Sequence, residues 1–183
     1  MNESAKAIAQ ADNTYFTDQF NNTDTITGYT RIGHELLQQV ANPIDAYCGG
    51  VGTAGMLMGV SHAMQKADNH TRIIALEPST SMVILTGKPG THHVEGIGVG
   101  FVPPLLDKNY YDEVRAIDET EARQMARRLA KVEGIFSGTS TGLNVVGALQ
   151  LAKELGPGHT VVTVAVDTGL KYLASDLYQQ RPI

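Results

Sequence analysis

Short apolar segments alternate with helical patterns along most of the chain, and this alternation is the feature that most constrains its fold. The runs at 44–48, 71–76 and 160–166 are apolar almost throughout. A strand with one face in water alternates apolar with polar residues, whereas a continuous apolar run predicts a strand that is buried on both faces. We therefore predict an α/β fold in which a parallel sheet lies between two layers of helices.

The capping and stop signals give approximate bounds for the other elements. Asp118, followed three residues later by Glu121, matches a capping box at the start of a helix. The 79–104 segment contains several Gly and Pro residues and is predicted to be a long functional loop. The remaining predicted elements are a helix over 28–40 capped by Thr27, a Gly turn over 49–55 that opens a helix to Ala67, a strand over 113–117, a helix to Glu133 that stops at Gly134, and a small-residue turn over 137–142 that opens a helix to Leu155.

Composition excludes several classes of protein. The 183 residues suit one domain, and the formal net charge of −5 does not favour nucleic-acid binding, which needs a basic face. The single cysteine, Cys48, cannot form an intramolecular disulfide and suits a reducing compartment. The apolar run at 161–166 is too short to cross a bilayer, and residues 1–13 lack the apolar core of a signal peptide. We expect a cytoplasmic protein without a membrane partner.

The first candidate site is the turn at 50–55, which fits the pattern GxGxxG between a predicted strand and a predicted helix. Free N–H groups and the helix dipole make such a turn suitable for a phosphate. Glu77 ends the next strand, near where a ribose-binding acid lies in a dinucleotide fold, so the turn also fits a module that binds NAD. The pattern alone does not distinguish a dinucleotide from a lone phosphate, or from a turn that needs glycine for its backbone only.

Two further clusters are expected near the same edge of the sheet. In the segment 136–142, Ser140 either caps a helix or reaches a ring nitrogen of a ligand. In the segment 94–101, alternating glycines allow a close backbone approach to a ligand. The adjacent His92 and His93 have no third ligand at metal spacing, so no metal site is predicted. Cys48 is expected to pack in the core and not to act as a nucleophile.

Taken in order, these motifs resemble a known family. The chain runs Gly-Val-Gly-Thr-Ala-Gly, Glu-Pro, Gly-Lys-Pro-Gly-Thr-His-His, Glu-Gly-Ile-Gly-Val-Gly-Phe-Val-Pro, Gly-Thr-Ser-Thr-Gly and Val-Asp-Thr-Gly-Leu-Lys-Tyr-Leu. From about Thr14 onward it resembles the C-terminal, large-domain part of the cysteine synthase and cystathionine β-synthase family, which are fold-type II pyridoxal-phosphate enzymes. The resemblance implies a three-layer αβα domain of the tryptophan synthase β type, and it displaces the NAD interpretation.

The resemblance also implies roles for individual residues. The phosphate of pyridoxal 5'-phosphate would be held by the turn that contains Gly52, Thr53, Ala54, Gly55 and Met56, with Met56 in the place of a threonine. Ser140 matches the serine that bonds the pyridine nitrogen, which suits β-elimination and β-replacement. The substrate-side loop would contain Gly96, Ile97 and Gly98. Lys171 stands where the family commonly has arginine, and no metal is implied.

The family's Schiff-base lysine and its smaller N-terminal domain have no counterpart in this sequence. Residues 1–183 are therefore expected to be a single large-domain portion without a catalytic lysine and inactive alone, in a parent transferase or lyase that forms cysteine or a related amino acid from an O-activated serine. The open explanations are a truncated enzyme, one half of a split enzyme, or a non-catalytic remnant that binds a phosphate ligand or a partner. An amino-acid substrate is expected, with either a homodimer of the complete enzyme or a chain that carries the missing half. The surface toward that half should be unusually apolar.

Overall fold

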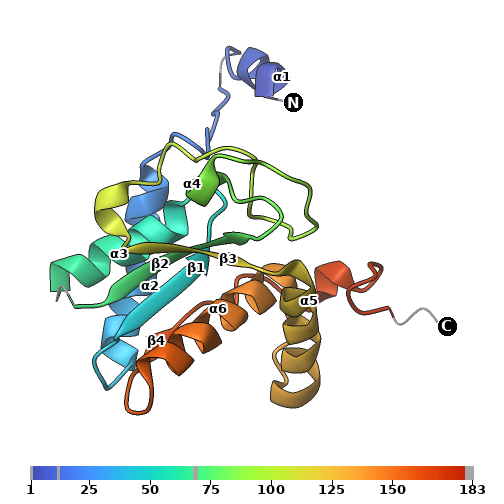
Figure 1. Ribbon diagram of the computed structural model, residues 1–183. Helices are drawn as coiled ribbons and strands as arrows, with labels where there is room; N and C mark the ends of the chain where they lie inside the picture. The colour runs from blue at the N-terminus through green and yellow to red at the C-terminus, as the bar shows by residue number, and fades with distance from the viewer. Residues whose placement is uncertain (1, 12, 68–69, 180–183) are drawn as a thin grey trace.

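A four-stranded parallel sheet forms the centre of the protein, whose computed structural model describes residues 2–11, 13–67 and 70–179 (Figure 1). The strand order is β3-β2-β1-β4, and each neighbouring pair is parallel. The predicted α/β class with a parallel sheet is confirmed. The strands are β1 (Ala46–Gly50), β2 (Arg72–Pro78), β3 (Glu113–Ile117) and β4 (Val161–Val162).

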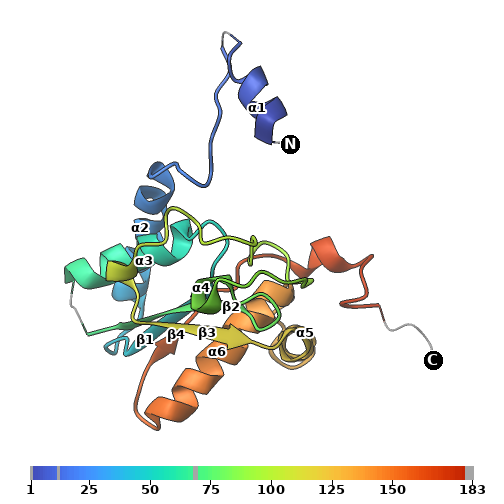
Figure 2. The same cartoon turned by 45° about the horizontal axis from the view of Figure 1, so that its top comes forward.

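Helices cover both faces of the sheet, as the two views show (Figures 1 and 2). The pair α2 and α3 lies on one face, and the pair α5 and α6 lies on the other. The helix α1 projects away from the body of the domain in both views. The helices are α1 (Asn2–Ile8), α2 (Asp24–Gln39), α3 (Gly55–Ala67), α4 (Val83–Thr86), α5 (Glu119–Arg128) and α6 (Thr139–Leu155), with the 3₁₀ turns η1 (Lys108–Tyr110) and η3 (Gly169–Tyr172) and the π turn η2 (Leu129–Glu133).

The two central strands supply side chains to two separate hydrophobic cores. Tyr47 and Ile73 point to the face covered by α3, and their neighbours Cys48 and Ile74 point to the face covered by α6. This is the period of two that a strand imposes on its side chains. Both faces of β1 and β2 are buried, which explains why their sequences are continuous apolar runs.

The caps at the start of α5 and the end of η2 match the sequence prediction. The Asp118 carboxylate accepts the N–H of Glu121 at 3.0 Å. Gly134 ends the π turn with a φ of 71°, a left-handed conformation that glycine adopts without steric cost. The helical segment from α5 to η2 therefore covers the predicted range, although its last turn is a π turn.

The predicted start of the second helix is wrong by one turn. α2 begins at Asp24, and Thr27, the predicted cap, lies inside it. The side-chain oxygen of Asn22 accepts the N–H of Asp24 at 2.9 Å, so the first turn is organised by a residue that precedes the predicted cap. Asp24 is also an acid in the first turn, where the helix dipole favours negative charge.

The prediction for 160–166 is wrong in burial and in length. Only Val161 and Val162 form β4, and the run is half-exposed up to Val164 and exposed at Ala165 and Val166. β4 is an edge strand with β1 as its only recorded neighbour among the described residues. Past β4 the run is attached by side chains instead of a ladder: the Thr163 hydroxyl donates to the Cys48 carbonyl at 2.7 Å.

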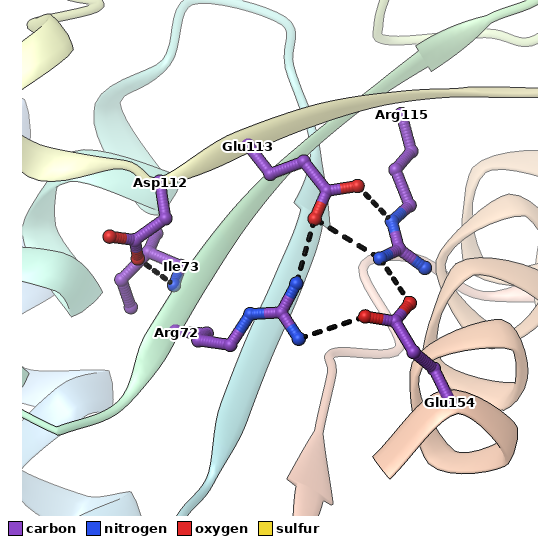
Figure 3. A network of polar contacts seen from close by, with 6 residues as sticks. All are labelled: Arg72, Ile73, Asp112, Glu113, Arg115 and Glu154. Carbon is purple, nitrogen blue, oxygen red and sulfur yellow. Dashed lines mark hydrogen bonds and ion pairs between the residues drawn. The ribbon is translucent and has the colours of Figure 1, made fainter.

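A network of ion pairs lies at the amino-terminal end of the strands (Figure 3). Arg72 opens β2 and bonds Glu113 at 2.9 Å and Glu154 at 3.0 Å. Arg115 on β3 bonds the same two carboxylates. The network ties β2 and β3 to the last turn of α6. Hydrogen bonds from Arg115 and then Arg72 hold the pKa of Glu154 below its ordinary value.

Candidate functional site

The turn between β1 and α3, residues 50–55, is held against the loop that contains Gly96. A side chain at Gly52 would place its Cβ 2.3 Å from the Gly96 carbonyl oxygen, so this close approach requires glycine. Ala54 has a φ of 71°, a left-handed conformation that is strained for alanine. We call residues 50–55 the cradle turn.

The start of α3, at the end of the cradle turn, has backbone N–H groups without a recorded acceptor among the described residues. The backbone N–H groups of Met56 and Leu57 have no hydrogen-bond acceptor among the described residues. Helix starts leave such groups free, and they carry the positive end of the helix dipole. Gly55 is the exception, since its N–H donates to the Thr53 hydroxyl at 3.3 Å. The site is therefore suited to an anion.

Ser140 lies in the first turn of α6, which follows the turn at 137–138. It is 4% exposed, and no hydrogen bond of its hydroxyl to another described residue is recorded. Asp167 positions this turn from the opposite side: one carboxylate oxygen accepts the N–H of Gly138 at 2.9 Å, and the other accepts the hydroxyl of Tyr172. Burial and the hydrogen bond to Asp167 raise the pKa of Tyr172, which therefore remains a donor.

The glycine loop over 94–98 is shaped by His92. One ring nitrogen of His92, Nε2, bonds the Gly98 carbonyl at 2.8 Å, and the other, Nδ1, accepts the N–H of Val94 at 3.2 Å. These two bonds assign a neutral ring protonated at Nε2. The N–H of Gly98 donates to the Val51 carbonyl at 3.0 Å, which joins the loop to the cradle turn.

One cavity of about 530 Å³ collects these parts at the carboxyl ends of the strands. Its volume lies in the range of small-molecule sites. The predicted residues that line it are Gly52, Thr53, Ala54, Gly55, Met56, Gly96, Ile97 and Ser140. Gly98 does not line it, and its N–H instead joins the loop to Val51 of the cradle turn.

Ile32 and Asn144 are residues of this site that the sequence prediction missed. Ile32 of α2 lines the cavity beside Tyr29, and Glu95, from the predicted 94–101 segment, lines it as well. Asn144 is 1% exposed and connects three elements around the cavity: its Oδ1 accepts the N–H of Gly50 at 2.8 Å, and its Nδ2 donates to the Val164 carbonyl at 3.0 Å. No local pattern marks Asn144, since its partners are 94 and 20 residues away in the sequence.

Glu77 lies outside the cavity and is fully engaged elsewhere. It is 2% exposed, and its carboxylate accepts the N–H groups of Ile84 at 2.8 Å and Leu85 at 3.0 Å, both in the single turn of α4. A ribose hydroxyl would have to compete with both bonds. The acid that the NAD interpretation required is therefore a structural residue.

Cys48 is also part of the core. It is fully buried, and burial raises the pKa of its thiol to about 11. A thiol with that pKa is almost entirely protonated at neutral pH, and the thiolate is the nucleophilic form. Cys48 therefore packs as a small apolar residue, as predicted.

Two other kinds of feature, a metal site and a membrane span, are absent from the described ranges. No group of three or more His, Cys, Asp or Glu side chains there could hold a metal ion. No helix in those ranges is long and apolar enough to span a membrane.

Comparison with known proteins gives the family. Residues 1–167 match the family described as "Pyridoxal-phosphate dependent enzyme". Over 147 residues the chain is 45% identical to a cysteine synthase of Staphylococcus aureus, covering 80% of this chain and 47% of that protein. A probable cysteine synthase of Bacillus subtilis is 34% identical over 179 residues, covering 95% of this chain and 58% of that protein.

A solved structure shows the same architecture. The cysteine synthase of Entamoeba histolytica superposes with a TM-score of 0.90 at 31% identity, covering 100% of this chain and 54% of that one. The chain thus spans about half the length of the relatives it matches. The family match, the sequence identity and the shared fold together show that this chain belongs to the fold-type II pyridoxal-phosphate-dependent enzymes, as a partial, cysteine synthase-like member.

Proposed function

We propose that residues 1–183 form the cofactor-binding portion of a pyridoxal-phosphate enzyme of the cysteine synthase type. One observation carries the proposal: one cavity joins N–H groups at the start of α3 to the hydroxyl of Ser140 at the start of α6, and neither has a recorded partner among the described residues. The first group suits a phosphate and the second suits a ring nitrogen. Pyridoxal 5'-phosphate carries both, so the residues present fit this cofactor.

Each part of the cavity has a definite task in this proposal. The backbone N–H groups of the turn from Gly52 to Met56, other than that of Gly55, hold the phosphate, and Met56 contributes no hydroxyl, so the main chain carries most of the binding. Ser140 bonds the pyridine nitrogen without protonating it. Asp167 is a positioning residue, because it fixes the turn that presents Ser140. When bound, the cofactor withdraws electrons from the substrate's α-carbon, which permits loss and replacement of a β-substituent.

The proposed reaction of the complete enzyme is β-replacement on an O-activated serine, with sulfide or a thiol as the nucleophile. The similarity to a cysteine synthase and a probable cysteine synthase supports this substrate class. The glycine loop at 96–98 would face the substrate side. A homodimer is proposed for the complete enzyme.

The missing half has a defined place in the proposal. None of the seven lysines has the sequence context of the family's Schiff-base lysine. We therefore propose that turnover requires a further half, on the same polypeptide or on a partner chain. Val166, Leu170 and Leu173 are 42%, 64% and 56% exposed, which supports a polypeptide cover for this side of the domain.

Cofactor binding is tested with 4'-deoxypyridoxine 5'-phosphate, which keeps the ring and the phosphate but has no aldehyde. Removing the Ser140 hydroxyl in Ser140→Ala removes one hydrogen bond, worth about 1 kcal/mol, and should weaken binding about fivefold. Ser4→Ala, an exposed substitution in α1, is the matched control and should leave binding unchanged. Equal affinity of the Ser140→Ala and wild-type chains would show that the ring does not lie against α6.

The reaction is tested in a chain completed with the amino-terminal half of the Staphylococcus aureus relative. The completed chain should form cysteine from O-acetylserine and sulfide, and the chain alone should not. Turnover by the chain alone would contradict the need for a second half. A completed chain that binds the cofactor without forming cysteine would contradict the substrate class.

A non-catalytic protein that binds a phosphate ligand is a second candidate. The cradle turn supports it, because Ala54 sits in a left-handed conformation and Met56 replaces a hydroxyl-bearing residue of the family pattern. This candidate predicts that inorganic phosphate binds while the completed chain stays inactive.

A further inference from the structure

Lys171 is the only lysine that lines the cavity, and all seven lysines of the chain lie in the described part. It sits in η3, the 3₁₀ turn that follows Asp167. No ion pair or hydrogen bond of its amine to a described residue is recorded. The amine is therefore free to react with a ligand that enters the cavity.

The turn that carries Lys171 is anchored by Tyr172, and Glu95 adds an acidic group to the same cavity. Tyr172, the next residue in η3, is 4% exposed and anchored through its hydroxyl to Asp167, so the turn that carries Lys171 is held in place. Glu95 lines the same cavity, and its carboxylate acts on the neighbouring Tyr172 hydroxyl: burial, Asp167 and then Glu95 raise the pKa of Tyr172. A negative charge at Glu95 favours a protonated imine nearby.

The residue type at position 171 matters for this chemistry. The family resemblance places arginine there, and an arginine guanidinium stays protonated and does not act as an amine nucleophile. A lysine keeps the positive charge and adds a primary amine that can form an imine with a carbonyl ligand. The change therefore adds a reactive group to the wall of the cavity.

We propose that Lys171 forms an imine with a phosphorylated aromatic aldehyde of the pyridoxal-phosphate class that is bound in the cavity. The inference rests on the proposed cofactor site. The ammonium first releases a proton to solvent, the amine nitrogen bonds the aldehyde carbon, and the aldehyde oxygen leaves as water while the C=N bond forms. Charge and atoms balance without an oxidant or reductant. The imine retains the ligand on this chain alone, and it does not supply the substrate contacts of the missing half.

Borohydride trapping tests the proposal with a readout that does not depend on activity. The chain is incubated with pyridoxal 5'-phosphate, reduced, and analysed by intact mass and peptide mapping. We expect one adduct per chain, at Lys171, and protection by excess 4'-deoxypyridoxine 5'-phosphate. Lys171→Arg keeps the charge and should reduce the adduct at least tenfold, whereas Lys153→Arg, on the exposed side of α6, should keep it.

The two proposals fail in different ways. If the deoxy analogue binds to wild type and to Lys171→Arg alike, but the adduct persists in Lys171→Arg or spreads over several lysines, the role of Lys171 is refuted and the cofactor site stands. If the analogue does not protect Lys171 from trapping, the imine forms outside the cavity and the role is again refuted. If the analogue does not bind at all, the cofactor site itself is refuted, and the inference falls with it.

Discussion

Asn144 is a buried polar residue whose removal should destabilise this domain strongly. Its amide bonds the Gly50 N–H at the end of β1 and the Val164 carbonyl beyond β4, and it is 1% exposed. Asn144→Ala leaves both partners without their bonds. A buried polar group left unpaired costs about 1–3 kcal/mol, so the pair predicts a loss of about 3 kcal/mol. That is a large fraction of the ~5–15 kcal/mol typical of a domain.

Urea unfolding followed by circular dichroism measures the loss. The midpoint should fall without a change in the slope of the transition, because the same surface is exposed on unfolding. Gln150→Ala, an exposed substitution on the same helix, is the control and should stay within ~0.5 kcal/mol of wild type. A loss below ~1 kcal/mol for Asn144→Ala would refute the reasoning that the two bonds hold the edge of the cavity.

The near-isosteric Asn144→Asp separates hydrogen bonding from volume. Aspartate still accepts from Gly50, but when ionised it faces the Val164 carbonyl without a proton to donate. Protonation restores that donor, so the deficit of Asn144→Asp relative to wild type should shrink as the pH falls. Asn144→Ala has no such group, and its deficit relative to wild type should not recover with acid. Equal pH dependence of the two deficits would contradict the assigned direction of these bonds.

Three further predictions use other parts of the fold. Native Cys48 should react with iodoacetamide at pH 8 at least tenfold more slowly than in urea, because burial raises its pKa to about 11; equal rates would contradict its burial. His92→Ala should weaken binding of 4'-deoxypyridoxine 5'-phosphate and lower Tm because it removes both bonds that shape the glycine loop, while the neighbouring, exposed His93→Ala should preserve binding; equal effects would refute that positioning role. The pKa of Glu154 is lowered in the folded protein, so the stability that its charge contributes is present above the ordinary pKa of 4.5 and is lost as the pH falls through the lower folded pKa. Glu154→Gln should therefore lower Tm at pH 7. A difference in Tm between variant and wild type that persists in acid would refute the assignment.

The parts of the site that the sequence predicted are those with local determinants. The glycines of the cradle turn and the start of α3 lie within a few residues of one another, and so do Ser140 and the start of α6. The continuous apolar runs indicated a sheet with both faces covered, and the cores around Tyr47 and Cys48 have that form. Short-range chemistry was sufficient for these features, because a helix start or a buried strand can be recognised from its own residues.

The parts that were missed depend on contacts between distant segments. Asn144 looks like any polar residue in a helix until its partners at Gly50 and Val164 are known. Lys171 was matched to a family position in the sequence, but its place in the wall of the cavity becomes visible only in the structure, where the bond between Tyr172 and Asp167 anchors η3. The start of α2 was missed for a smaller reason, since Asn22 competes with Thr27 as an initiator and both are residue types that favour helix starts.

The error at 160–166 has a different cause, and it bears on the proposed second half. An apolar run indicates that a segment is buried in the working protein, but it does not indicate which chain buries it. Here β1 pairs with two residues of the run, and Ala165 and Val166 remain exposed together with Leu170 and Leu173 further along. An exposed, apolar sheet edge is an aggregation hazard that proteins ordinarily cover. The relatives are about twice as long as this chain, so a covering segment of comparable size is available in proteins of this family. The edge beside β4 is therefore the place where the proposed second half should change hydrogen-exchange protection most when it binds.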